Sequence, residues 1–144
     1  MISSESSSDP PRTAARRIAG VAAASGLYDA VVGAVMILGR PMLASLFRVP
    51  LPVPPIHADL NGIFLLSVAA GYLIPYRDPQ SRGGRLYMWV MGPVLKGGGA
   101  GAFLIDYVVR HSPPSFLLFA LSDGTMAVLA VWALVTTAKW RVAA

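Results

Sequence analysis

Residues 86–109 read LYMWVMGPVLKGGGAGAFLIDYVV, an apolar stretch long enough to cross a lipid bilayer, with one lysine, Lys96, near its middle. A lysine at the bilayer centre costs roughly 2.5–3.5 kcal/mol on insertion scales, so it is normally paired, buried between helices or in contact with water. Two other apolar stretches carry Asp29 and Asp123 at similar depth. These three ionisable groups are the main indication of function in this chain.

The composition is typical of a membrane protein. Of the 144 residues, 55% are hydrophobic and only 13% are charged, whereas a soluble domain of this size carries about 25% charged residues. The formal charge of +5 does not indicate nucleic-acid binding, because the arginines fall in the short gaps between apolar stretches. The absence of cysteine excludes disulfides, thiol redox chemistry and cysteine-ligated metals.

The hydropathy pattern predicts an all-α integral membrane protein, an antiparallel four-helix bundle with residues 16–141 as its membrane domain. Residues 1–15 are rich in serine, proline and charge, and we expect a disordered cytoplasmic tail there. The gap between the third and fourth spans is so short that these two helices must be adjacent and antiparallel. The expected spans are about residues 18–38, 59–75, 86–109 and 115–138.

A proline-rich outer loop separates the first two spans. Residues 41–56 read PMLASLFRVPLPVPPI, and the prolines from position 50 onward exclude a regular helix there because each removes a backbone donor. Residues 42–47 could form one short interfacial helix. Asp59 is the expected N-cap of the second span. A polar, basic loop at residues 77–85 follows this span.

Two features of the third span predict an irregular backbone. Pro93 should kink the helix. The glycine-rich run at residues 97–101 indicates close packing against a neighbouring helix, with local unwinding, as in the discontinuous helices of transporters, as the alternative.

Basic residues predict the orientation. Eight lysines and arginines fall in the N-terminal tail, the second loop and the C-terminus, against three in the two loops of the other side. The positive-inside rule therefore places both termini in the cytoplasm. Both termini on the same side of the membrane agree with an even number of crossings, here four.

The depth of the three ionisable groups follows from the helical rise of 1.5 Å per residue. Asp29 and Lys96 lie about 16 and 15 Å from the inner face, and Asp123 lies about 12 Å from the outer face, so all three are near the centre of a core roughly 30 Å thick. Ser25, Gly26 and Gly33 share the helix face of Asp29, and small residues beside a charge indicate a helix contact. We expect Lys96 to be the counter-ion of one or both carboxylates.

A second polar group is expected at the outer face, and its spacing matches no known metal motif. Helix capping and an i, i+4 pair between Asp106 and Arg110 explain it without a metal site. Its members are His57, Asp59, Asn61, Asp106, Tyr107, Arg110 and His111.

The architecture resembles that of the DoxX-like small bacterial membrane proteins. Most of the likeness lies in residues 55–75, PIHADLNGIFLLSVAAGYLIP, together with the proline-rich first outer loop, and it covers the first three spans. The resemblance implies a multi-pass protein of the bacterial inner membrane. It also implies a link with sulfur-compound or quinone-dependent oxidation for some members, and it transfers no residue role.

No catalytic motif is present, since the chain lacks G-x-S-x-G, H-E-x-x-H and a phosphate loop. The leading expectation is a non-enzymatic accessory or structural subunit, with a buried network of Asp29, Lys96 and Asp123, that packs as a homo-oligomer or against other membrane subunits. One alternative is binding of a lipophilic small molecule, a quinone or a lipid, or proton transfer at these charges. Another is a DoxX-like membrane oxidoreductase component. The cofactor stays unassigned.

Overall fold

The computed structural model describes residues 10–138, and each regular element in that range is a helix. This confirms the expected all-α class. Four stretches of the described residues are long and apolar enough to cross a membrane: Arg12–Leu38, Ile56–Arg77, Arg82–Arg110 and Pro114–Thr137. The elements are α1 (Pro10–Leu38), α2 (Arg40–Phe47), α3 (Ile56–Gly71), α4 (Leu73–Arg77), α5 (Arg82–Trp89), the π-helical segment η1 (Val90–Lys96), α6 (Gly97–Arg110), the 3-10 turn η2 (Pro114–Phe116) and α7 (Leu117–Ala138).

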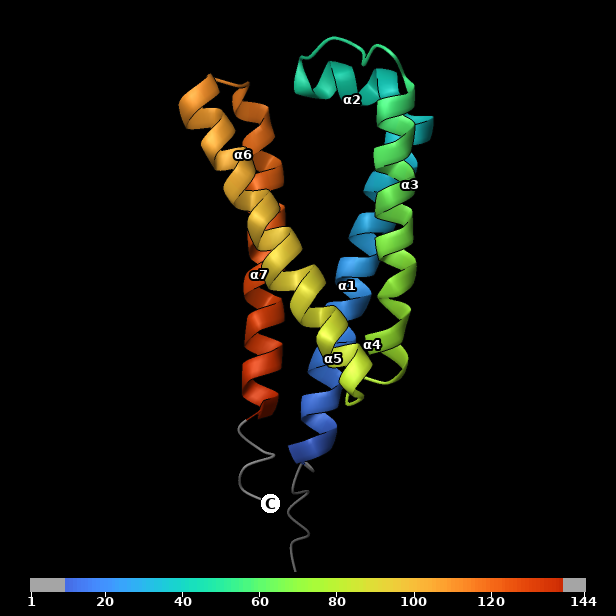
Figure 1. The fold of residues 1–144 in the computed structure, drawn as a ribbon, viewed down its shortest axis with the longest axis vertical. Coiled ribbons are helices and arrows are strands. Elements are labelled where there is room, and N and C mark those ends of the chain that lie inside the picture. Colours follow the sequence, from blue (N-terminus) through green and yellow to red (C-terminus); the bar gives the residue numbers. More distant parts are fainter. Residues whose placement is uncertain (1–9, 139–144) are drawn as a thin grey trace, which may run out of the picture.

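The helices form two groups that meet at one end and diverge at the other (Figure 1). Helix α1 packs along α3 and α4, while α6 packs along α7 as the short loop between them predicted. The first residues of α1 and the last of α7 lie at the end where the groups meet. Helix α2 lies across the divergent end (Figure 1).

Helix α1 begins earlier than expected. It starts at Pro10, so residues 10–15 are helical and the prediction of disorder there is wrong. Proline is well suited to the first turn of a helix, and the alanines and arginines that follow have high helix propensity. Residues 1–9 of the predicted tail lie outside the described range.

The loop between the first two spans has the expected form. Helix α2 covers the predicted short helix, and the backbone from Val49 is non-helical up to the start of α3. The N-cap prediction for Asp59 is wrong, because α3 begins at Ile56 and Asp59 lies within its first turn. Its carboxylate instead accepts a hydrogen bond from the Arg40 guanidinium at 2.8 Å.

The loop between the second and third spans is shorter than predicted. Helix α4 continues to Arg77, and α5 already begins at Arg82. Ser81 is the N-cap of α5, and its Oγ accepts a hydrogen bond from the Gly84 amide at 3.0 Å. Arg85, also assigned to the loop, lies in α5 and donates to Thr137 Oγ1 at 2.9 Å, which joins α5 to α7.

The third span is continuous but irregular. Pro93 lies inside η1, where the backbone forms a π-helix. Proline has no N–H to donate and its ring clashes with the carbonyl four residues earlier, so the turn widens. The glycine-rich run is helical and belongs to α6, so local unwinding is not observed there.

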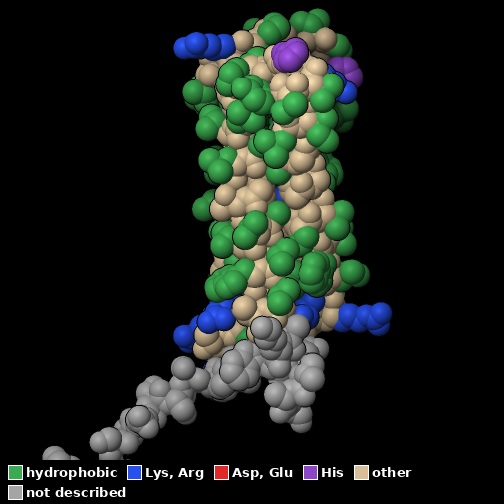
Figure 2. Space-filling model, turned by 90° about the vertical axis from the view of Figure 1, so that its left-hand side faces the viewer, with side chains coloured by type: hydrophobic (Ala, Val, Ile, Leu, Met, Phe, Trp, Pro, Cys, Tyr) green, Lys and Arg blue, Asp and Glu red, His purple; other side chains and the backbone are tan. Residues whose placement is uncertain are grey.

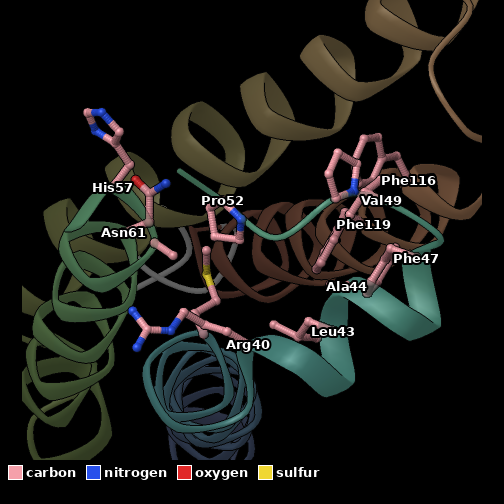
Figure 3. Close-up of a pocket in the computed structure, with 13 residues that line it drawn as sticks. Arg40, Leu43, Ala44, Phe47, Val49, Pro52, His57, Asn61, Phe116 and Phe119 are labelled. Carbon is pink, nitrogen blue, oxygen red and sulfur yellow. The ribbon is translucent and has the colours of Figure 1, made fainter. Parts of the chain in front are cut away.

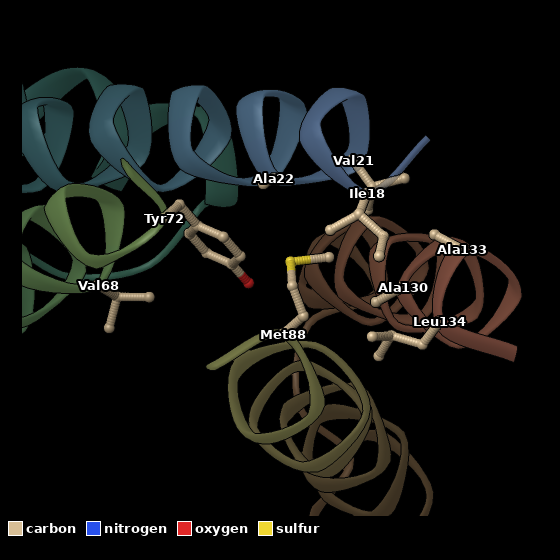
Figure 4. Close-up of a cluster of buried hydrophobic side chains, with 9 residues drawn as sticks. All are labelled: Ile18, Val21, Ala22, Val68, Tyr72, Met88, Ala130, Ala133 and Leu134. Carbon is tan, nitrogen blue, oxygen red and sulfur yellow. The ribbon is translucent and has the colours of Figure 1, made fainter. Parts of the chain in front are cut away.

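A hydrophobic cluster closes the end at which the two groups meet. Tyr72 and Met88 point toward each other at its centre, between α1 and α7 (Figure 4). Tyr87 packs against the cluster, and its hydroxyl donates to the Val68 carbonyl at 2.5 Å. The cluster comprises Ile18, Val21, Ala22, Val68, Tyr72, Met88, Ala130, Ala133 and Leu134.

Two glycines bring α1 and α3 into close contact. A Cβ on Gly33 would lie 2.8 Å from the Gly62 carbonyl oxygen, and one on Gly26 would lie 3.1 Å from the Tyr72 Cβ. Both glycines were predicted to share a helix-facing stripe with Asp29, and the structure confirms that contact. Close approach of this kind is a common feature of helix pairs in membranes.

Candidate functional site

The three ionisable side chains from the middle of the spans lie together. Lys96 Nζ donates to Asp29 Oδ1 at 2.7 Å and to Asp123 Oδ1 at 3.4 Å. They come from α1, η1 and α7, which are far apart in the sequence. We call Asp29, Lys96 and Asp123 the charge cluster.

Burial differs between the two carboxylates. The side chain of Asp29 is 1% exposed and that of Lys96 is 5% exposed, whereas the side chain of Asp123 is 19% exposed. Asp29 Oδ2 is buried and has no hydrogen-bond partner among residues 10–138. The closest pair, Lys96 with Asp29, is therefore deeply buried, and Asp123 is the more accessible member.

Tyr28 completes the surroundings of the lysine. Lys96 Nζ lies 4.8 Å from the centroid of the Tyr28 ring, within the range of a cation–π interaction. The Tyr28 hydroxyl shares a hydrogen bond of 2.7 Å with Ser122 Oγ, which joins α1 to α7 beside the charge cluster. This role of Tyr28 was not predicted, and the only indication of it in the sequence is that Tyr28 precedes Asp29.

The backbone of the third span brings Lys96 to its partners. Lys96 is the last residue of the π-helical segment, and such segments are frequent at functional sites. One turn later, a Cβ on Gly99 would lie 3.2 Å from Asp123 Oδ2. The absence of a side chain at Gly99 therefore leaves room for the Asp123 carboxylate.

A cavity of about 280 Å³ lies against the charge cluster, and all three of its members line it. Most of the remaining wall is apolar or aromatic. Asn61, expected at the outer face, also lines this cavity. The other lining residues are Tyr28, Val32, Met36, Phe64, Leu65, Leu95, Gly99, Phe103 and Phe119.

A second cavity of about 280 Å³ lies toward the divergent end, under α2. It is surrounded by the C-terminal end of α1, helix α2, the N-terminal end of α3 and the start of α7 (Figure 3). Met36, Asn61 and Phe119 line both cavities, so the two adjoin. We call the first the inner cavity and the second the outer cavity.

Helix α2 is held over the outer cavity at both of its ends. Arg40 and Asp59 form an ion pair with N···O 2.8 Å. At the other end, Ser115 Oγ donates to the Phe47 carbonyl at 2.9 Å, and the Phe47 ring stacks on Phe119 with centroids 4.8 Å apart. Arg40 was not predicted as a site residue, and the indication in the sequence is that Arg40 and Asp59 flank the proline-rich loop.

Six of the seven residues predicted for the outer-face group lie on two helices, and His111 is the C-cap residue that follows α6. His57, Asp59 and Asn61 belong to α3, while Asp106 and Arg110 belong to α6, and these helices are apart at this end (Figure 1). The expected pair of Arg110 with Asp106 is confirmed at 3.0 Å, and Ser112 also donates to Asp106. Within residues 10–138, no group of three or more acidic or histidine side chains is arranged to hold a metal ion.

The chain was compared with protein-family models, with curated proteins and with solved structures, and none of the three comparisons found a match. The resemblance to DoxX-like proteins therefore stays a prediction. The geometry of the charge cluster and its cavities is the basis for the functional argument.

Proposed function

We propose that the protein binds a lipophilic small molecule in the inner cavity, with the polar group of that molecule against the charge cluster. One observation carries the proposal. A cavity of about 280 Å³ with mostly apolar walls ends on Asp29, Lys96 and Asp123. Small-molecule sites have this composition, an apolar lining with a few convergent polar groups, and the cavity is just below their usual volume of about 300–1,000 Å³.

The packing of the charge cluster favours a ligand site over a purely structural ion pair. An ion pair that only joins helices is most stable when neighbouring groups enclose it and satisfy it. Here Asp123 is partly exposed on the cavity side and Asp29 Oδ2 is unpartnered among the described residues. Asp123 thus retains hydrogen-bonding capacity at the cavity, and the buried ion pair beside it is not fully satisfied by the described residues.

The hydrophobic cluster favours binding over proton transfer across the bundle. Ile18, Met88 and Leu134 are at most 1% exposed and lie between the charge cluster and the end where α1 begins. A proton path needs polar groups or water along its length. The inner cavity instead continues into the outer cavity, toward the opposite end.

The proposed setting is the bacterial inner membrane, with both termini in the cytoplasm. Large apolar side chains are exposed along the helices, as at Leu27, Val94 and Val108. Lysine and arginine side chains lie at both ends of the molecule and the histidines at the divergent end (Figure 2). By sequence, more of the basic residues belong to the end where the two helix groups meet, which we call the basic end. The positive-inside rule supports a cytoplasmic position for the basic end.

A cavity-filling variant tests this proposal. Val32 lines the inner cavity, whereas its neighbour Val31 is 54% exposed on the outside of the bundle. The protein is extracted gently from its native membrane, and native mass spectrometry detects bound small molecules. We expect a small-molecule adduct on the wild type and on Val31→Trp, and its loss from Val32→Trp, because the indole would occupy the cavity. An adduct retained equally by both variants would contradict the proposal.

The same measurement tests the accessory-subunit hypothesis. Cβ atoms added at Gly98 and Gly101 of α6 would meet nothing within 4 Å, so this small-residue surface is open to another helix. Protein subunits that co-purify in fixed ratio, with no small-molecule adduct, would favour the accessory role. A quinone mass on the wild type would instead support the oxidoreductase alternative that the DoxX-like resemblance implies.

A further inference from the structure

We infer that the ligand is a lipophilic monocation and that its positive charge lies against Asp123. This inference rests on the proposed function and specifies the chemical class of ligand. It follows from the pairing of charges, from the accessibility of one carboxylate and from the aromatic lining of the inner cavity.

The pairing of charges leaves one carboxylate in excess. Arg40, in the wall of the outer cavity, is paired with Asp59 at 2.8 Å. Lys96 is paired most closely with Asp29, at 2.7 Å. Asp123 lies farther from the same ammonium, at 3.4 Å. When all three members of the charge cluster are ionised, they carry one net negative charge, which a single bound cation would neutralise.

Asp123 is also the carboxylate that a ligand can reach. Its side chain is 19% exposed, against 1% for Asp29, and it lines the inner cavity. The charged and titratable groups that interact with it are Lys96 from η1, Tyr28 and Asp29 from α1, and Tyr72 at the end of α3. Gly99 of α6 leaves room for Asp123 Oδ2, since a Cβ there would lie 3.2 Å from that oxygen, and Gly99 lines the same cavity.

The aromatic lining suits a cation. Tyr28, Phe64, Phe103 and Phe119 line the inner cavity, and the faces of aromatic rings attract positive charge. Burying an uncompensated charge in an apolar site is strongly unfavourable. An anionic ligand would increase the net negative charge of the cluster, whereas a monocation removes it.

Two ions of the same shape and opposite charge test the inference on the wild-type protein. Tetraphenylphosphonium is a lipophilic cation, and tetraphenylborate is the matched anion. Binding of each to the purified protein in neutral detergent is measured by equilibrium dialysis. We expect tetraphenylphosphonium to bind about tenfold more tightly or better, because the ionised cluster carries one net negative charge in a partly desolvated site. Equal binding, or tighter binding of tetraphenylborate, would overturn the inference.

Substitutions of Asp123 locate the bound charge. Asp123→Asn removes the negative charge at similar size, and we expect the affinity for tetraphenylphosphonium to fall by about tenfold or more. Asp123→Glu, which keeps the charge, should retain most of the binding. Asp106→Asn is the matched control, because Asp106 lines neither cavity and is paired with Arg110 on α6. If Asp123→Asn does not fold, the comparison of the two ions on the wild type still decides the inference.

The outcomes separate this inference from the proposed function. If the wild type retains a neutral or anionic adduct that Val32→Trp loses, and tetraphenylphosphonium does not bind, the cavity is a ligand site but the inference is wrong. If neither ion binds and no adduct depends on Val32, both proposals fail.

Discussion

At the scale of single residues, the central feature is a lysine that stays buried in the middle of a span. Lys96 is 4% exposed, yet its ammonium group contacts two carboxylates and one aromatic ring. Each contact offsets part of the cost of removing the charge from water. The side chains of Lys96 and Asp29 are therefore interdependent, and removal of one leaves the other as an uncompensated buried charge.

This interdependence predicts the effect of Lys96→Met. The variant should lower the free energy of unfolding by about 3–5 kcal/mol, because it leaves buried carboxylates without a counter-ion. The double variant Lys96→Met with Asp29→Asn should recover a large part of that loss. Titration of the purified protein with a denaturing detergent measures both effects.

Arg110→Met provides the control for the lysine substitution. Its side chain is 78% exposed and pairs with Asp106 at the surface, so the stability should hardly change. Unchanged stability of Lys96→Met would show that the ammonium group is not paired in the membrane.

At the scale of elements, one glycine of the third span packs closely against α7, whereas another glycine of the same span faces open space. A Cβ on Gly92, within the π-helical segment, would lie 2.5 Å from the Cβ of Ala130 on α7. A Cβ on Gly98, six residues later, would meet nothing within 4 Å. The close approach of the third and fourth spans near the charge cluster thus depends on Gly92.

We expect opposite responses to the same substitution at these two glycines. Gly92→Ala should destabilise the protein by about 1–3 kcal/mol, because α7 or η1 must move to admit the methyl group. Gly98→Ala should be neutral or stabilising by up to about 1 kcal/mol, since alanine has the higher helix propensity. Thermal unfolding in detergent, followed by circular dichroism, compares the two. Equal destabilisation would contradict the close packing at Gly92.

At the scale of the whole molecule, the two helix groups are packed tightly at one end and separated at the other. The hydrophobic cluster joins them at the basic end, whereas the inner and outer cavities lie toward the divergent end under α2. The position of the cavities therefore follows from the arrangement of the helix groups. A lipophilic ligand would reach the charge cluster from the membrane or from the side of α2.

The orientation in the membrane is predicted from the basic end and is open to direct measurement. The chain has no cysteine, so a single engineered cysteine gives an unambiguous label. Val53 is 89% exposed in the loop after α2, and Gly83 lies at the start of α5 with open space around it. In intact cells, a membrane-impermeant maleimide should label Val53→Cys, and it should label Gly83→Cys only after the membrane is disrupted. The reverse pattern would show that the basic end faces outward.

Most of the helices, and the depth of the three charges along them, could be predicted from local sequence rules. Long apolar runs predict spans because backbone groups in lipid must be satisfied within a helix, and the helical rise then places Asp29, Lys96 and Asp123 near one plane. Proline, which lacks a backbone N–H, also explains the non-helical loop before α3 and the irregular backbone at Pro93. These features depend on nearest neighbours along the chain.

Which side chains meet between the helices depends on packing, and the sequence indicated only that Lys96 would pair with one or both carboxylates. Hydropathy gives the length and depth of a span but not its rotation, which depends on how small residues such as Gly33 and Gly92 pack against other helices. That rotation sets the 2.7 Å contact of Lys96 with Asp29 and the longer one with Asp123, and it leaves the inner cavity beside them. Asp59 shows the same limit: local rules predicted an N-cap, whereas a contact across the proline-rich loop made it the partner of Arg40.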